Sequence, residues 1–266
     1  MRPPYSLRMG SGPLLATAVH DGHDLRPEVE SRIALDDRTR LREEDPGTGA
    51  WTIVAPSRIV AHRSRFELDL NRARDQAVYR TPDAAWGLEV WARPLPPPVV
   101  ERSLAWYDHF YEDLGTLLGR LIEASGGVLV YDLHSYNHRR SGPNAASAPD
   151  VENPDVNLGT QWIDRDRWRP VVDAFLDTAG KARVGGRELD ARENVRFQGG
   201  HLSGWISREF PERACVLAIE VKKIFMDEWT GELDEALARD VRGMLSATVR
   251  PALRAFRGRL PSRSAR

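Results

Sequence analysis

The hydrophobic pattern of the chain contains three short apolar runs that each carry a polar, chemically capable side chain near their end. The runs cover residues 14–20, 127–136 and 216–221, and these side chains are His20, His134 and Glu220. Apolar runs of this length, bounded by turn residues, are typical of buried strands. Ligands bind outside the carboxyl ends of strands in open α/β sheets, so the pattern predicts that the three side chains share one site.

Longer segments between these runs repeat apolar residues every three or four positions, which predicts helices. The clearest helices are expected over 104–122, 165–182 and 233–256, with a short one over 28–34. Further strands are predicted at 59–62, 66–70, 86–91 and 194–197. Because strands and helices interleave, we expect an α/β fold with one mixed, mostly parallel sheet flanked by helices.

The motifs extend along the chain without a linker long enough to separate two modules. The proline cluster at 94–98 is a stiff connector. A chain of 266 residues also lies within the range of one large domain. We therefore expect a single catalytic domain over 1–258 and a short basic tail over 259–266.

Composition and charge argue against several classes of protein. A net charge of −1 does not provide the basic surface that nucleic-acid binding needs. No stretch approaches the roughly 20 apolar residues of a membrane span, and the N-terminus lacks the apolar segment of a secretory signal. The single cysteine, Cys215, lies in an apolar run as a core residue and fits a reducing compartment. We expect a cytoplasmic protein with a small-molecule substrate and no nucleic-acid or membrane partner, and the sequence sets no oligomeric state.

The two strand-end histidines, His20 and His134, predict a metal centre. Catalytic zinc takes three protein ligands from His, Glu or Asp and keeps its fourth position for water. The third ligand should be an acid, and the densest acidic cluster lies at 43–45, just before a proline. A histidine three residues after His20 is a further option, as a ligand or a substrate contact. The alternatives for the third ligand are thus Glu44, Asp45 and His23.

A carboxylate inside an apolar run is costly unless it is paired or functional, which singles out Glu220. Burial raises a carboxyl pKa towards neutral pH, where a base that accepts a proton from an activated water works best. The alternative is a buried ion pair with Lys222, which strand alternation puts on the same face, or with Lys223. Asp132 shares the face of His134 and either orients its imidazole or caps a backbone group.

The pair Asn71–Arg72 is suited to a substrate carboxylate. Arginine binds a carboxylate through two parallel hydrogen bonds, and asparagine adds a directional donor. A surface salt bridge is the alternative for Arg72, and Arg65 is a second candidate for the same role.

Taken together, these stretches resemble the N-formylglutamate amidohydrolase (deformylase) family. The motifs that carry the resemblance follow the order of the family: His20-Asp21-Gly22, Glu44-Asp45-Pro46, the segment 64–72 (SRFELDLNR), Asp132-Leu133-His134-Ser135, the segment 154–159 (PDVNLG), the segment 196–200 (RFQGG), and Glu220 followed by Phe225-Met226-Asp227-Glu228. Each motif alone is short, and it is their order over residues 20–228 that is specific.

The resemblance implies a zinc carboxypeptidase-like, phosphorylase/hydrolase-like α/β fold. It also implies that Zn²⁺ is bound by His20, Glu44 and His134. Glu220 would then be the general base.

For the substrate, the resemblance implies that Asn71 and Arg72 hold a carboxylate. Arg65 or His201 would assist the metal in stabilising the oxyanion. The chain departs from the family pattern in the basic run Tyr136–Arg140 and in His201, which follows the paired glycines. Both departures concern the substrate, so we expect Tyr136 and His201 in the substrate pocket.

The expected function is zinc-dependent hydrolysis of the amide or formamide bond of an N-formyl or N-acyl acidic amino acid, such as N-formylglutamate, by metal-activated water. Two alternatives stay open. One is a zinc amidase or peptidase that acts on another N-acyl amino acid or peptide, and the other is a binding or regulatory relative without catalysis.

Overall fold

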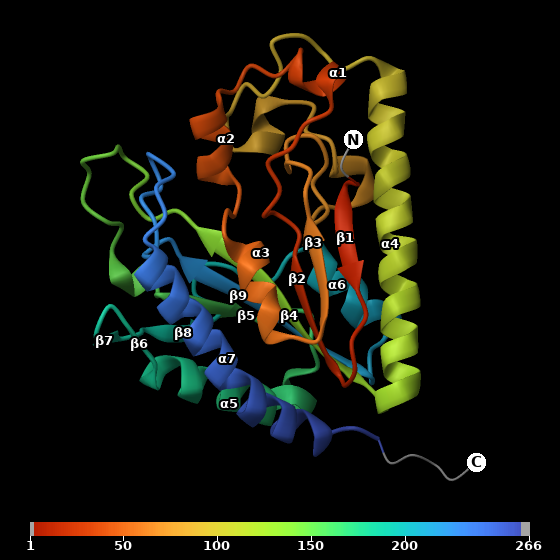
Figure 1. The fold of residues 1–266 in the computed structure, drawn as a ribbon, viewed down its shortest axis with the longest axis vertical. Helices are drawn as coiled ribbons and strands as arrows, with labels where there is room; N and C mark the ends of the chain where they lie inside the picture. The colour runs from red at the N-terminus through yellow and green to blue at the C-terminus, as the bar shows by residue number, and fades with distance from the viewer. Residues whose placement is uncertain (1–2, 262–266) are drawn as a thin grey trace.

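The computed structural model describes residues 3–261 and builds them around one seven-stranded sheet (Figure 1). From edge to edge the strands are β1 Tyr5–Arg8, β3 Ser57–Ala61, β2 Leu14–Ala18, β4 Val128–Tyr136, β9 Ala214–Lys222, β5 Val156–Gly159 and β8 Ala191–Glu193. The central pairs β3–β2, β2–β4 and β4–β9 are parallel, as is β5–β8, whereas β1–β3 and β5–β9 are antiparallel. The predicted mixed, mostly parallel sheet flanked by helices is confirmed.

Helices surround this sheet. In Figure 1, α4 stands along one side of the molecule, and α5 and α7 lie side by side away from it. The helices are α1 Pro27–Glu30, α2 Asp37–Glu43, α3 Thr48–Trp51, α4 Pro97–Ser125, α5 Arg165–Lys181, α6 His201–Glu209 and α7 Glu235–Arg257. Short 3₁₀ helices are η1 Thr52–Val54, η2 Arg74–Gln76, η3 Pro82–Ala85 and η4 Asp150–Glu152, and a small hairpin joins β6 Arg183–Val184 to β7 Arg187–Glu188.

The ends of the long helices follow from local chemistry. Prolines occupy the first turn of α4, where no backbone donor is needed, so this helix begins before the apolar repeat does. Gly126 ends it with a φ of 83°, a conformation that glycine adopts without strain. Asp164 and Asp234 cap α5 and α7 by accepting hydrogen bonds from backbone N–H groups of the first turn.

Three predicted strands, at 66–70, 86–91 and 194–197, are not strands in the structure. The alternating apolar residues of the segment 66–70 pack into two different hydrophobic cores. Phe66 belongs to a small separate core, and Leu68 and Leu70 belong to the main one. In the other two, Trp86 and Asn194 each adopt a left-handed φ of 53°, which interrupts an extended chain. Short apolar segments therefore occur in loops as well as in strands in this protein, and only 66–70 of these three is fully buried.

The register of the central strands collects polar groups at one end of the sheet. His134 lies opposite Glu220 in the β4–β9 pair, and Glu220 lies opposite Asn157 in the β9–β5 pair. β2 pairs with the other side of β4, and His20 follows two residues after its last residue, Ala18. These side chains thus form one row across adjacent strands.

No helix within residues 3–261 is long and apolar enough to cross a bilayer. The last helix, α7, ends at Arg257, close to the predicted end of the domain. Most of the predicted basic tail, residues 262–266, lies outside the described residues.

Candidate active site and metal centre

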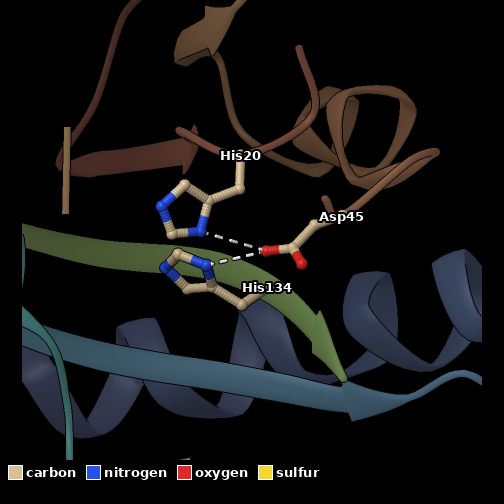
Figure 2. A group of neighbouring side chains, drawn as sticks. All are labelled: His20, Asp45 and His134. Atoms are coloured by element: carbon tan, nitrogen blue, oxygen red, sulfur yellow. Dashed lines mark hydrogen bonds and ion pairs between the residues drawn. The ribbon is translucent and has the colours of Figure 1, made fainter. Parts of the chain in front are cut away.

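Three buried side chains, His20, Asp45 and His134, point their donor atoms towards one another at the end of the central strands (Figure 2). Their donor atoms all lie within 4.8 Å of one another. Asp45 Oδ2 is 3.0 Å from His134 Nδ1 and 3.4 Å from His20 Nδ1. Two imidazoles and one carboxylate are a ligand set that catalytic zinc uses.

Each imidazole has a further carboxylate partner at Nε2, the ring nitrogen that faces away from Asp45. His20 Nε2 lies 2.7 Å from Asp69 Oδ1, and His134 Nε2 lies 3.2 Å from Asp132 Oδ1. Such partners fix the ring orientation of metal-binding histidines and leave the inner nitrogen free for the metal. Asp132 therefore orients the imidazole, one of the two roles expected for it, and its oxygens also accept hydrogen bonds from Thr17 and Ser203.

The electrostatics of this cluster favour positive charge. Burial alone would lower the pKa of His134, but the carboxylates of Asp132 and Glu220 raise it well above its ordinary value. Burial would raise the pKa of Asp45, yet hydrogen bonds from His134 and His20 hold it far below its usual range. A buried site that stabilises a cation between two imidazoles and a carboxylate fits a divalent metal ion.

The acid beside the two histidines is Asp45, not the Glu44 implied by the family resemblance. Glu44 directs its carboxylate the other way, where Oε2 lies 2.6 Å from His23 Nδ1 and Oε1 accepts a hydrogen bond from Ser64. The backbone at Glu44 is extended, so its side chain and that of Asp45 point to opposite sides. This geometry also keeps His23 away from the cluster.

Glu220 belongs to the same site and forms no salt bridge among the described residues. Lys222, one of the two partners considered as the alternative to a catalytic role, lies 3.0 Å from both Asp150 and Asp155 instead. Lys223 Nζ donates to the backbone carbonyls of Arg42 and Glu44, at 2.7 and 2.8 Å. Desolvation raises the pKa of Glu220 to about 7.

All four groups line one cavity of about 390 Å³. Three of the residues expected to act on the substrate line it too, and these are Arg65, Asn71 and Tyr136. Asn71 Nδ2 lies 3.4 Å from His134 Nε2. Gly200 packs directly on this amide, because a Cβ there would stand 2.3 Å from the Asn71 side chain.

Arg72 and His201, which were also expected to act on the substrate, are not among the residues that line the cavity. The guanidinium of Arg72 lies 5.0 Å from the Tyr79 ring centroid, and its Nε is 3.8 Å from Asp69. His201 Nε2 lies 3.1 Å from the Tyr107 hydroxyl. The carboxylate-binding role implied for Arg72 therefore stays a prediction of the family resemblance.

Several site residues had no assigned role in the sequence-based interpretation. Asp69 holds His20 and is itself held by Arg65 Nη2 at 2.8 Å and by the Tyr79 hydroxyl. Arg196 lines the cavity, although only its motif stood out in the sequence. Asp69 lies in the quoted segment 64–72, but nothing in that segment reveals that its partner lies 49 residues away.

Comparisons with known proteins agree with this architecture. The family model for N-formylglutamate amidohydrolase matches residues 12–226. The structure is similar to that of an N-formylglutamate amidohydrolase from Ralstonia eutropha JMP134, with 20% sequence identity, a TM-score of 0.72 and coverage of 97% of this chain and 100% of that one. A gene product from Agrobacterium tumefaciens has a TM-score of 0.66 and 16% identity, with 95% of each chain covered. No curated protein matches the sequence significantly.

Proposed function

The chain belongs to the N-formylglutamate amidohydrolase family, and we propose that it is a zinc-dependent hydrolase of an N-formyl or N-acyl acidic amino acid such as N-formylglutamate. One observation carries this proposal. The buried donor cluster of His20, Asp45 and His134 opens onto the same cavity as Glu220, a carboxylate without a salt-bridge partner among residues 3–261.

His20, Asp45 and His134 would hold the metal ion, with Asp69 and Asp132 fixing the imidazoles from behind. A bound Zn²⁺ supplies Lewis acidity, which polarises a carbonyl and makes water acidic near neutral pH.

Glu220 is the proposed general base. Its carboxylate accepts a proton from the water that attacks the carbonyl carbon, and it returns this proton to the nitrogen of the leaving amine as the C–N bond breaks. A pKa near 7 suits a group that must both accept and release a proton at neutral pH.

Asn71 and Arg65 support this chemistry in different ways. Asn71 Oδ1 accepts a hydrogen bond from the Leu202 backbone N–H at 2.9 Å, which fixes the amide so that Nδ2 is a ready donor for a substrate oxygen. Arg65 is bonded to Asp69, Tyr79 and the Glu43 carbonyl, so in this geometry it stabilises the Asp69–His20 pair.

The test combines metal analysis with turnover of N-formyl-L-glutamate. The wild type should bind about one zinc per chain and hydrolyse the formamide, and His134→Ala should lose the metal. Glu220→Gln keeps the size of the side chain but removes the base. It should therefore retain zinc while kcat falls by roughly 100- to 10,000-fold.

Glu101→Gln, an exposed position on α4, is the matched control and should behave as the wild type. Full turnover by a zinc-loaded Glu220→Gln variant would rule out the proposed base. A zinc-loaded wild type that hydrolyses other N-acyl amino acids but not N-formyl-L-glutamate would favour the amidase alternative. A protein that binds metal and hydrolyses none of them would favour the binding relative.

A further inference from the structure

We infer that Arg196, assisted by Arg140, forms the anion-binding part of the substrate cavity and makes the enzyme select substrates with a carboxylate, an inference that rests on the proposed function. Both arginines line the cavity that contains His134 and Glu220. This assignment moves the carboxylate contact from Arg72, which lies outside the cavity, to a different segment of the chain.

The first argument is charge. Among residues 3–261, neither Arg196 nor Arg140 forms a salt bridge with a carboxylate. The Nε atom of Arg196 is buried and has no hydrogen-bond partner. An enclosed guanidinium donor without an acceptor is costly, so this group is poised for an anionic ligand.

The other two arginines of the cavity are already neutralised. Arg65 lies 2.8 Å from Asp69, and Arg42 lies 2.9 Å from Glu43. Their positive charge is compensated by carboxylates of the protein itself. Lys223 also lines the cavity, but its Nζ donates to the backbone carbonyls of Arg42 and Glu44. The guanidinium charge available to a substrate in this cavity therefore comes from Arg196 and Arg140.

The second argument is that the fold holds Arg196 in place. Asn157 Oδ1 accepts a hydrogen bond from the Arg196 backbone N–H at 2.8 Å, and Asn157 Nδ2 donates to the Phe197 carbonyl at 2.8 Å. The guanidinium carbon lies 5.8 Å from the ring centroid of Tyr136 and 5.5 Å from that of Phe197. Cation–π contacts of this kind stabilise the charge on its faces and leave the N–H edges free for a carboxylate.

The segment that carries Arg140 is also anchored. Buried Glu228 accepts hydrogen bonds from the backbone N–H groups of His138 and Arg139, at 2.7 and 2.9 Å. This contact fixes the start of the loop after β4, from which Arg140 extends to the cavity. Two guanidinium groups on separate segments suit a substrate with two carboxylates, with the planar fork of each matching one carboxylate.

The test uses zinc-loaded Arg196→Gln with two substrates of nearly the same shape. One is N-formyl-L-glutamate, and the other is its neutral analogue N-formyl-L-glutamine amide. Loss of a charge-assisted hydrogen-bond pair should lower kcat/KM for the acid by about 10- to 100-fold and leave that for the analogue unchanged. Arg196→Lys, which keeps the charge but not the fork, should restore part of the loss.

Arg169→Gln is the matched control, because this arginine lies on α5 with a side chain that is 73% exposed. It should leave kcat/KM unchanged for both substrates. Arg140→Gln should also lower kcat/KM for N-formyl-L-glutamate without lowering it for the neutral analogue. Equal losses for acid and analogue in Arg196→Gln, or no loss for the acid, would overturn the inference.

A binding measurement separates this inference from the proposed function. Titration calorimetry with glutarate, a dicarboxylate without a scissile bond, should show binding to the zinc-loaded wild type that is at least about 10-fold weaker in Arg196→Gln. If the wild type hydrolyses no formamide but glutarate affinity depends on Arg196, the proposed function fails and the anion site stands. If hydrolysis proceeds and neither glutarate affinity nor kcat/KM responds to Arg196, only the anion site fails.

Discussion

At the scale of single residues, the site is organised by carboxylates that face imidazoles. Asp45 lies between the inner nitrogens of His20 and His134, while Asp69 and Asp132 hold the outer ones. Each imidazole is thereby fixed from both sides. Ring orientation depends on the outer carboxylates as much as on the strands that carry the histidines.

The outer carboxylates should therefore control metal affinity. Asp69→Asn keeps the shape of the side chain but removes the charge opposite His20 Nε2. We expect zinc affinity to fall about 10- to 100-fold, because the imidazole loses the partner that orients it and raises its basicity. Competition with a chromophoric chelator measures this change.

Asp108→Asn is the control, since Asp108 is half-exposed and bonded to Arg74 at the surface. It should leave zinc affinity unchanged. An unaltered affinity in Asp69→Asn would show that Asp69 serves folding alone.

At the scale of elements, the site depends on one row of residues across β4, β9 and β5. The row contains His134, Glu220 and Asn157, and each is paired with its neighbour by strand register. Asn157 extends the row beyond the sheet, because its side chain holds the turn that carries Arg196. The proposed roles in metal binding, proton transfer and anion binding are thus linked through three adjacent strands.

Asn157→Ala should disturb this turn. The side chain is fully buried, and its Oδ1 accepts hydrogen bonds from the backbone N–H groups of Val195, Arg196 and Phe197 at 3.0, 2.8 and 3.3 Å. Loss of the acceptor leaves donors unsatisfied, so we expect the free energy of unfolding to fall by about 1–3 kcal/mol. Urea denaturation measures this loss.

Activity gives a second measurement for the same variant. KM for N-formyl-L-glutamate should rise more than kcat falls, because the donor cluster of His20, Asp45 and His134 stays in place together with Glu220. Asn144→Ala, in the exposed part of the loop after β4, is the control. Unchanged stability and KM in Asn157→Ala would show that the turn at 195–197 keeps its conformation without the Asn157 side chain.

At the scale of the whole molecule, ion pairs connect the long loop after β4 to the sheet. Asp155 lies 2.6 Å from Arg187 and 3.0 Å from Lys222, whose ammonium also contacts Asp150. These pairs join β5, the β6–β7 hairpin and β9. They explain why Lys222 is unavailable to Glu220.

The Asp155 network should make stability depend on pH. Burial would raise the pKa of Asp155, but hydrogen bonds from Arg187, the Asp190 backbone and Lys222 lower it to about 2 from an ordinary value of 3.8. A carboxylate with a depressed folded-state pKa stabilises the protein above its unfolded-state pKa. This contribution is lost as the pH falls from about 4 to about 2.

Urea denaturation at a series of pH values tests this dependence. The free energy of unfolding should decline through that window in the wild type, and Asp155→Asn should flatten this part of the decline. The variant should also lose about 1–3 kcal/mol at neutral pH, because buried Lys222 loses one partner. Asp177→Asn, an exposed position on α5, should reproduce the wild-type profile. If Asp155→Asn shows the same decline as the wild type, Asp155 is not the source of the pH dependence.

The sequence by itself determined the sheet class, the long helices and the strand ends at His20, His134 and Glu220. These features are local, because each depends on the spacing of apolar residues within one segment. The short segments at 66–70, 86–91 and 194–197 were assigned wrongly. The first is a buried loop, which leaves the same apolar signature as a buried strand, and the other two are partly exposed segments interrupted by left-handed residues.

Only the tertiary structure decided which side chains meet. Glu44 and Asp45 are adjacent and chemically alike, and the extended backbone between them directs Asp45 to the histidines and Glu44 to His23. Arg72 and Arg196 are equally charged in the sequence, yet only Arg196 lines the cavity. Chain direction and long-range packing fix these outcomes, and neither is encoded in the residue types of one motif.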